Sequence, residues 1–451
     1  MQKIIIKNFG AIKEAEIDIP KTLVLIGEQA SGKSTIAKLV YFFQTLKEDY
    51  LRWLIVQHAE EDFTLIVKNK FLDFFELYIE HGLDLKFFTE KKYTQFIHIF
   101  NDSNNDVQVV LPNRLADKEA IKHLKSNFDT LKLLKQINIQ NLATEQFLLI
   151  EKTKNESTQV FKDMSEIHFN IKYDNAAYLI AGRSATVSFG DLFEKHLFSD
   201  LSNRKTIDEF LIYQFIEHIS RIKTFYKNRG GSFENILRKG EQNLLSTKAE
   251  NKISEILKGK YKNNGGGESL TLENGKSISL SQSSSGQQEA IRILQDIYLV
   301  IAQKTASLRV VEEPEAHLFP IAQKQMIELL ALMVNQNAEN SLIVTTHSPY
   351  ILSSFNNLLF ASRVVEKNAD AESEVAKIVD IDFRLKAADF AAYTLRNTEG
   401  GFVSESIMSE KGVIKQNYLD TASEMLGYEF NNLYSIHAKT FARIEYKLLN
   451  S

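Results

Sequence analysis

The chain of 451 residues contains no cysteine, which removes several kinds of chemistry at once. Without thiols there can be no disulfide bond, no thiolate metal site and no cysteine nucleophile. A reducing cytosol fits this composition, so we expect a cytoplasmic protein. The sequence also lacks a run of about 18 apolar residues, so neither a membrane span nor a membrane partner is expected. The N-terminus is not followed by a long apolar region or a small-residue cleavage site, which predicts that the chain is not secreted.

A strong excess of one charge is absent as well. Lysine and arginine number 54 against 58 aspartates and glutamates, which gives a formal net charge of −4. This balance argues against a basic nucleic-acid-binding surface over the whole molecule, but a local basic groove stays open. The apolar and charged fractions, 44% and 25%, are those of a soluble globular protein. The length allows two or more domains, each with its own core.

One segment indicates a class of ligand. Residues 27–34 read G-E-Q-A-S-G-K-S and match the phosphate-binding pattern G-x-x-x-x-G-K-[ST] at every required position. In such a loop the main-chain N–H groups point at phosphate oxygens. Lys33 would reach the β- and γ-phosphates, and the Ser34 hydroxyl would bind Mg²⁺. An apolar run at 22–26 and helical spacing from Ile36 predict the strand, loop and helix that the motif needs. The alternative is a surface loop before an ordinary helix.

A serine-rich segment follows a predicted hairpin at 270–280. Residues 283–288 read S-S-S-G-Q-Q and lead into a helix with an apolar stripe. Small residues at the N-terminus of a helix can bind an anion. The serines could equally serve only to cap the helix.

Two apolar runs end in residues that can carry chemistry. The run at 308–311 is followed by Glu312 and Glu313, and the run at 341–346 is followed by His347. Ligands bind at the carboxyl ends of parallel strands. One carboxylate could therefore hold Mg²⁺, the next could activate a water molecule, and the histidine could bind a γ-phosphate. The alternatives are a solvated acidic turn and a structural histidine.

The order of these motifs resembles that of the ABC-type ATPases of the SMC, RecF and OLD branch. The resemblance implies an α/β fold, namely an ABC-type P-loop ATPase core with a mixed or parallel sheet, and ATP with Mg²⁺ sandwiched between two subunits. It assigns ATP binding to Gly27, Gly32, Lys33, Ser34, Thr35, Ser284, Ser285 and Gly286. It assigns the metal to Ser34 and Glu312, the catalytic base to Glu313, and the switch histidine to His347. Ser285 replaces a common glycine, and Glu312 stands where aspartate is usual.

The segment 178–184, Y-L-I-A-G-R-S, is similar to a Tyr-Ile-Pro-Ala-x-Arg segment of OLD-like and anti-phage-defence ATPases. In those proteins the arginine lies near the nucleotide, so the resemblance adds Arg183 to the nucleotide-binding residues. An arginine that anchors a loop to a carboxylate is the alternative. Members of the family also carry a glutamine after the strand of this segment, and it has no clear counterpart here. Gln44 is a poor candidate, because it lies too early in the chain, on the first predicted helix.

The patterns divide the chain into a core, an insertion and a tail. The core is predicted at 1–45, 170–190 and 260–400. A mostly helical lid or arm is predicted at 46–258, with a hairpin near 93–111. A helical C-terminal tail is predicted at 401–451.

Within its branch, the chain resembles the stand-alone ATPases of anti-phage systems, similar to AriA and PtuA, which work beside a separately encoded nuclease. The expected function is ATP hydrolysis in a homodimer or higher homo-oligomer that acts as a sensor and switch in defence. DNA or a phage protein is a further candidate partner. The alternative is a RecF- or SMC-like ATPase of DNA repair or chromosomes. The string E-E-P-E-A-H at 312–317 argues against a transporter. Asp380 and Asp382 could be the metal pair of a nuclease, but a surface turn is favoured.

Overall fold

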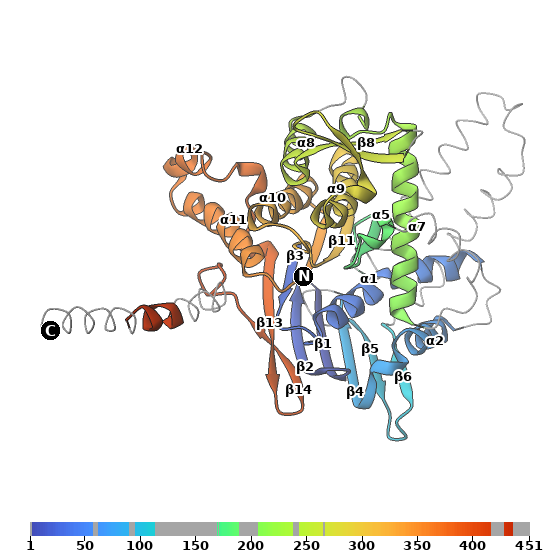
Figure 1. Ribbon diagram of the computed structural model, residues 1–451. Helices are drawn as coiled ribbons and strands as arrows, with labels where there is room; N and C mark the ends of the chain where they lie inside the picture. The colour runs from blue at the N-terminus through green and yellow to red at the C-terminus, as the bar shows by residue number, and fades with distance from the viewer. Residues whose placement is uncertain are drawn as a thin grey trace, which may run out of the picture.

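A large mixed sheet forms the centre of the molecule (Figure 1). The computed structural model describes residues 2–56, 62–89, 95–112, 169, 171–188, 206–237, 243–264, 267–415 and 428–435. In these residues the sheet has 11 strands in the order β6-β5-β4-β1-β2-β14-β13-β3-β12-β11-β7. The strands are β1 (Gln2–Phe9), β2 (Ile12–Ile19), β3 (Thr22–Ile26), β4 (Ile79–Phe88), β5 (Phe96–Asn101), β6 (Val107–Val110), β7 (Asn175–Leu179), β11 (Ser307–Glu312), β12 (Ser341–Thr346), β13 (Phe390–Thr398) and β14 (Gly401–Ser406).

The sheet has a parallel half and a mainly antiparallel half. Strands β13, β3, β12, β11 and β7 run parallel to one another. Strands β2, β1, β4, β5 and β6 pair antiparallel. Parallel neighbours need long crossover connections, and helix α10 (Pro320–Gln336) provides one between β11 and β12. The sheet is therefore mixed, as the sequence predicts.

Helices cover both faces of the sheet, and a small second sheet lies beside them (Figure 1). The remaining α-helices are α1 (Lys33–Val56), α2 (Phe63–Phe75), α5 (Ala185–Ser188), α7 (Ile207–Asn228), α8 (Leu244–Leu257), α9 (Ser285–Gln303), α11 (Pro349–Lys367) and α12 (Glu372–Val375). The second sheet contains β8 (Gly259–Asn264), β9 (Gly267–Leu272) and β10 (Ser277–Ser279). The short 3-10 helices are η1 (Glu76–Tyr78), η4 (Phe233–Asn235), η5 (Leu280–Gln282), η6 (Ala369–Ala371), η7 (Ile381–Phe383) and η8 (Ala387–Asp389).

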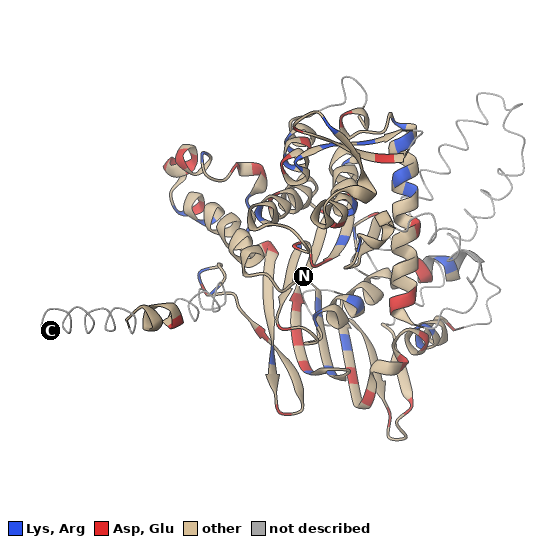
Figure 2. Ribbon diagram, viewed as in Figure 1, with Lys and Arg blue, Asp and Glu red and all other residues tan. Residues whose placement is uncertain are grey.

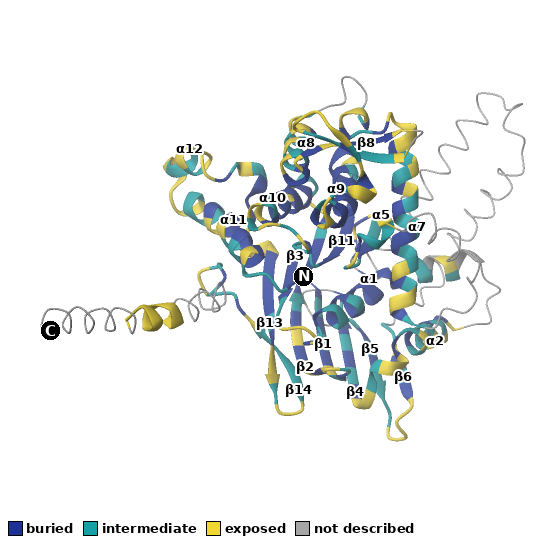
Figure 3. Ribbon diagram, in the orientation of Figure 1, coloured by how far each residue is buried: buried dark blue, intermediate teal, exposed yellow. Residues whose placement is uncertain are grey.

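Strand β3 shows how the sequence builds two hydrophobic cores. Side chains alternate across a strand, so Leu23 and Leu25 pack with the apolar side of α1, whereas Val24 packs with α9, α10 and α11. All three side chains are fully buried, and the central strands of Figure 3 are coloured accordingly. Burying an aliphatic side chain of this size contributes roughly 1.5–3 kcal/mol. The strand before the phosphate-binding segment is thus fixed from both sides.

The hairpin predicted near 93–111 exists, but it belongs to the large sheet. Strands β5 and β6 pair antiparallel, and β4 joins them to β1. The buried residues of β4, Leu83, Leu85 and Phe87, alternate as a half-buried strand requires. The first part of the predicted lid therefore extends the core. The segments 113–168 and 189–205 of that predicted insertion lie outside the described residues.

The predicted helical tail begins with a strand. Residues 401–406 form β14, which pairs with β13 in a hairpin and with β2 at the centre of the sheet. The turn uses Gly400 and Gly401, both with positive φ, and a glycine pair between two β-rich runs is a hairpin signal. A predicted boundary at 400/401 therefore divides one hairpin. Residues 428–435 are helical and exposed, and the rest of the tail from 416 lies outside the described residues.

Candidate nucleotide site

The register of the parallel strands brings the predicted site residues to one edge of the sheet. Thr346 at the end of β12 lies opposite Ile26 at the end of β3. Glu312 at the end of β11 lies opposite Thr345. The residues that follow these three strands therefore leave the sheet at the same edge, where parallel α/β sheets bind ligands. The structure thus brings together the loop at 27, the acidic residues and His347.

The phosphate loop, residues 27–34, has a geometry that only glycine permits at its last turn. Gly32 has φ of 95°, and a β-carbon there would lie 2.9 Å from Cγ1 of Ile12. Glycine is required on both counts, because a side chain would be strained and would also collide. Helix α1 begins at the next residue, and Ser34 and Thr35 are half-buried in its first turn. The free N–H groups of this turn favour an anion.

Lys33 lies across the phosphate loop. Its ammonium group donates to the carbonyl oxygens of Gly27 and Glu28 at 2.9 and 2.6 Å. Burial lowers the pKa of Lys33 from its usual 10.5 to about 8, while Glu313 and Glu315 act in the opposite direction. The pKa of this lysine is thus close to neutral pH. A bound phosphate would raise it again, because a negative charge favours the charged form.

Glu312 is buried at the end of β11 and already oriented by two donors. The Tyr178 hydroxyl donates to its Oε1 at 2.7 Å, and the main-chain N–H of Ala181 donates to Oε2 at 3.2 Å. Burial, and then the charge of Glu312, raise the pKa of Tyr178 well above its usual value, so the phenol stays a donor. Mg²⁺ prefers oxygen ligands and is commonly held by one or two carboxylates together with substrate phosphates and water. Glu312 is a carboxylate fixed in place at the edge of the sheet that also carries the phosphate loop and Ser34, and this donor set fits that ion.

Glu313 has a strained backbone and contacts His347. Its φ is 43°, which side-chain-bearing residues rarely adopt. Its N–H donates to the carbonyl of Thr345 at 2.9 Å, which ties the residue to the neighbouring strand. Its carboxylate Oε1 lies 3.3 Å from Nε2 of His347, and both side chains are partly exposed. Strain of this kind persists where surrounding contacts impose it and is frequent at functional sites.

Glu315 holds the switch-histidine segment, a role that sequence reasoning missed. Its Oε1 accepts from the Thr346 hydroxyl at 2.6 Å and from the main-chain N–H of His347 at 2.8 Å. Its Oε2 is buried and, among the described residues, has no hydrogen-bond partner. The signal was present in the sequence as a third carboxylate in the same acidic string. The local sequence pattern does not indicate, however, that this carboxylate accepts hydrogen bonds from residues at the end of another strand.

The signature segment, residues 283–288, caps helix α9. Ser284 is the N-cap, and it exchanges hydrogen bonds with Gln287 in a capping box. Ser284 and Ser285 are nevertheless exposed. Gly286, by contrast, is buried. A β-carbon there would lie only 2.5 Å from the carbonyl oxygen of His317, so no other residue would fit without a shift. The glycine therefore lets α9 approach the acidic turn, residues 312–318, of its own chain.

The phosphate loop and the signature segment do not meet within the chain. Among the described residues no hydrogen bond joins residues 27–34 to Ser284, Ser285 or Gly286. The structure groups Lys33 with the acidic turn and His347, and leaves Ser284 and Ser285 exposed at the start of α9.

Arg183 lies against the main chain of Glu312 and Glu313, the acidic residues of the candidate site. It is fully buried, and its guanidinium donates to the carbonyl oxygens of Ile180, Glu289, Glu312 and Glu313. Burial lowers its pKa, and Glu289 is the largest influence that opposes this. These bonds anchor the segment 178–184 to the acidic residues and to α9. The geometry matches the alternative interpretation, in which the arginine anchors a loop.

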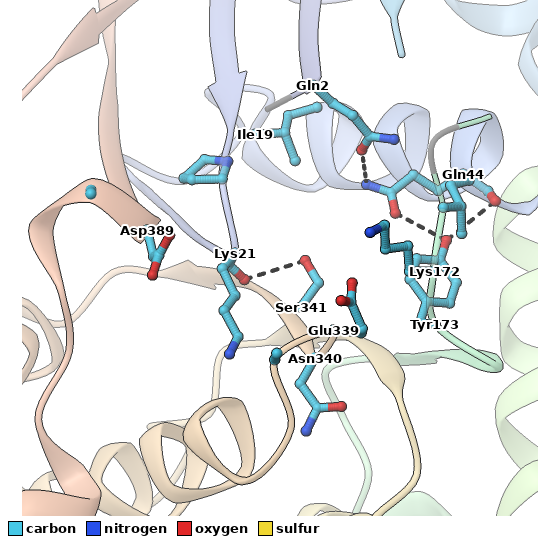
Figure 4. Close-up of a pocket in the computed structure, with 14 residues that line it drawn as sticks. Gln2, Ile19, Lys21, Gln44, Lys172, Tyr173, Glu339, Asn340, Ser341 and Asp389 are labelled. Carbon is cyan, nitrogen blue, oxygen red and sulfur yellow. Dashed lines mark hydrogen bonds between the residues drawn. The ribbon is translucent and has the colours of Figure 1, made fainter. Parts of the chain in front are cut away.

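Gln44 lies at the other end of the strands. Its amide donates to Oε1 of Gln2 at 3.1 Å, and its own Oε1 accepts from the Tyr173 hydroxyl at 3.0 Å (Figure 4). These residues line a polar cavity of about 380 Å³ near Lys21, which precedes β3. Hydrogen bonds therefore hold Gln44 far from the phosphate loop. This agrees with the sequence analysis, which did not favour it as the family's glutamine.

Asp380 and Asp382 do not form a metal pair in this structure. The ammonium group of Lys248 lies 2.6 Å from a carboxylate oxygen of each aspartate. Within the described part of the chain, no group of three or more His, Asp or Glu residues could hold a metal ion. The surface-turn interpretation accounts for this pair.

The fold and motif arrangement define a P-loop ATPase core of the ABC type. Residues 1–352 match the family model described as AAA ATPase domain, and the chain belongs to that family. It is an ATP-hydrolysing P-loop enzyme, so the predicted fold class and enzyme class are confirmed. No match was found among curated proteins.

Solved structures with a similar fold include several SMC heads. The SMC head domain from Thermotoga maritima is 12% identical with a TM-score of 0.38, and the match covers 90% of this chain and 98% of that one. A structure of the SmcHead bound to the C-winged helix domain of ScpA is 10% identical, with 91% and 98% coverage and a TM-score of 0.41. A Pyrococcus furiosus Smc head with an extended coiled coil bound to ScpA is 11% identical, with 90% and 96% coverage and a TM-score of 0.37. In the described residues, no helix combines the length and apolarity needed to cross a membrane.

Proposed function

We propose that two copies of this chain enclose ATP and Mg²⁺ between them, and that binding and hydrolysis close and reopen the pair. One observation carries the proposal. Lys33, Glu313 and His347 share one edge of the sheet, whereas Ser284 and Ser285 are exposed and not bonded to that edge. A second copy would supply the signature segment that a single chain leaves unused. Each copy then contributes half of every site.

In the proposed reaction, the residues of one copy prepare the water and hold the triphosphate. Glu313 accepts a proton from water as the water oxygen attacks the γ-phosphorus, and ADP leaves with the electrons of the broken P–O bond. Lys33 and the N–H groups of the phosphate loop bind the phosphate oxygens, and His347 lies within reach of Glu313 to orient the γ-phosphate. Ser34 and Glu312 would hold Mg²⁺, which supplies charge neutralisation at the phosphates when bound.

The biological role that we propose is a switch in anti-phage defence. This part rests on the resemblance of the motif strings to stand-alone defence ATPases similar to AriA and PtuA. The aspartate pair that could have formed a nuclease is occupied by an ion pair with Lys248, which favours a separately encoded nuclease as the effector. The closed, ATP-bound form would present a surface to that effector, and hydrolysis would withdraw it.

The substitution Glu313→Gln tests the proposal directly, since it removes the base but keeps the shape of the side chain. Hydrolysis should fall about 10²- to 10⁴-fold, the usual contribution of a general base. ATP should still bind, and an ATP-dependent dimer should accumulate in light-scattering measurements. Glu273→Gln, at an exposed turn, is the matched control and should hydrolyse ATP normally. Unchanged turnover in Glu313→Gln would refute the assignment of the base.

The same variant can identify the partner. Glu313→Gln purified with ATP from cells that carry its neighbouring genes should retain a nuclease that Lys33→Ala releases. If duplex DNA is retained instead and wild-type hydrolysis is stimulated by it, the RecF- or SMC-like alternative holds. One feature favours that alternative: Lys260 and Lys262 lie exposed on one face of β8, close to the basic end of α7 (Figure 2). Stimulation of this kind should decline steeply with salt.

A further inference from the structure

Arg183 makes an unusual set of contacts for a fully buried arginine. Instead of a fork against one carboxylate, it reaches main-chain carbonyls in three separate segments. One nitrogen donates to the carbonyls of Ile180 at 2.7 Å and Glu312 at 2.6 Å. The other terminal nitrogen donates to the carbonyl of Glu313 at 2.9 Å. The guanidinium therefore holds the peptide units on both sides of the Glu313 α-carbon.

Glu289 ties this arrangement to helix α9. Its carbonyl accepts from Nε of Arg183 at 3.2 Å. Its carboxylate accepts from the main-chain N–H groups of Arg183 at 2.9 Å and Ser184 at 3.0 Å. The buried charge of Arg183 is thereby compensated. Glu289 stands little more than one helical turn after Ser284, so the capped start of α9 and this carboxylate move as one unit.

We propose that Arg183 is a positioning residue that connects the signature segment to the catalytic base of the same copy. The inference rests on the proposed function, because it assigns a purpose to the contact between α9 and the acidic turn. Glu313 has a strained φ of 43°, and such a conformation persists only when neighbouring groups impose it. Its main chain is held by Arg183, by the N–H of Ala316 and by the Thr345 carbonyl, and of these only Arg183 is a side chain that contacts α9. When Ser284 contacts ATP bound to another copy, movement of α9 displaces Arg183 with it. Arg183 then places Glu313 where it can accept a proton from the attacking water.

The substitution Arg183→Lys tests this, since it keeps the charge but cannot span the carbonyls of Glu312, Glu313 and Glu289 together. We expect kcat to fall about 10- to 100-fold, the range that misplacement of a reacting group by about 1 Å can produce. The Kd for a fluorescent ATP analogue should change by less than about threefold, because Arg183 does not line the phosphate loop. Glu289→Gln should lower kcat in the same selective way.

Arg292→Lys is the matched control. Arg292 is also a fully buried arginine, and it lies on α9 itself. It pairs with Glu268 at 2.6 and 2.8 Å and donates to the Thr186 hydroxyl at 3.3 Å and, among the described residues, makes no hydrogen bond to the acidic turn. If Arg183 matters only for stability, both variants should lose thermal stability and lose kcat to the same extent. A selective loss of kcat in Arg183→Lys, with ATP binding retained, supports the positioning role. Equal kcat in Arg183→Lys and wild type overturns it.

A double substitution separates this inference from the proposed function. In a Glu313→Gln background Arg183→Lys should cause no further loss of hydrolysis, since the group that it positions is already gone. A further loss equal to that in the wild-type background would show that Arg183 acts elsewhere and would overturn the inference. If Glu313→Gln itself hydrolyses ATP normally, the proposed base is wrong. Should Arg183→Lys not fold, Glu289→Gln alone decides by the same two measurements.

Discussion

The affinity of this protein for ATP should weaken as pH rises above about 8, and Lys33 is the reason. Burial lowers the pKa of this side chain from 10.5 to about 8 in the free protein. A triphosphate next to the ammonium group would raise that pKa again, since an opposite charge favours the charged form. Binding above the free-state pKa therefore has to take up a proton. By linkage, affinity is full below that pKa and is lost as pH increases through it.

The size of the effect follows from the free-state pKa. With a value of about 8, roughly three quarters of the lysine side chains are charged at pH 7.5 and about 9% at pH 9. The Kd for ATP should accordingly increase about eightfold over this interval, which corresponds to about 1.3 kcal/mol. The terminal phosphate of the nucleotide is already ionised in this range, because its second pKa is about 6, so its own titration does not add to the change.

The assay is the Kd of a fluorescent, non-hydrolysable ATP analogue for the unsubstituted protein, in which Glu313 still contributes to the pKa of Lys33, measured from pH 7.5 to 9 at constant ionic strength. Two variants serve as controls. Lys33→Arg keeps its charge over this range, so any remaining affinity should be nearly independent of pH. Lys21→Arg alters a second lysine with a burial-lowered pKa, but one at the opposite end of β3, about 16 Å away, and should leave the wild-type dependence intact. A constant or increasing affinity in the parent protein would refute the reasoning.

Two further substitutions follow from contacts around the acidic turn. Glu315→Ala removes two hydrogen bonds to the segment that carries His347, so the free energy of unfolding should fall by roughly 2–4 kcal/mol in urea titrations; Glu315→Gln keeps one acceptor and should lose less, and equal losses would contradict this account. Gly286→Ala places a β-carbon 2.5 Å from the His317 carbonyl, so thermal unfolding should shift to lower temperature by an amount equivalent to about 1–3 kcal/mol, whereas an unchanged transition would show that the approach of α9 is not tight.

The parts of the fold that could be predicted are those whose cause is local. The run at 22–26 is apolar after Thr22 and precedes a glycine-rich loop, so strand, loop and helix follow from the sequence alone. The Asn-Gly pair between β9 and β10 predicts its hairpin in the same way. The cap of α9 also follows from the sequence, because Ser284 and Gln287 stand three residues apart, as a capping box requires.

The parts that could not be predicted depend on pairing between distant segments. Strand β14 pairs with β2, almost the whole chain away, and its short polar sequence does not reveal that it fills the centre of a sheet. Arg183 shows the same limit at the site. Its residue type fits a nucleotide contact and a structural anchor equally well, and only its burial against Glu289 and the acidic turn distinguishes them.

These distant contacts also bear on how two sites in a dimer would communicate. In the proposed dimer, Ser284 of one copy faces ATP bound to the other, while Gly286 packs that same helix start against the acidic turn of its own chain. The ATP that Ser284 of one copy contacts and the ATP that Glu313 of the same copy hydrolyses are therefore different molecules. Because the hydrogen bonds of the buried Arg183 are short, and Gly286 leaves no room for a β-carbon beside the His317 carbonyl, these contacts transmit a displacement of α9 rather than absorb it. Filling one site should then alter catalysis at the other, and hydrolysis by mixed dimers that carry one Glu313→Gln copy should depart from half the wild-type rate.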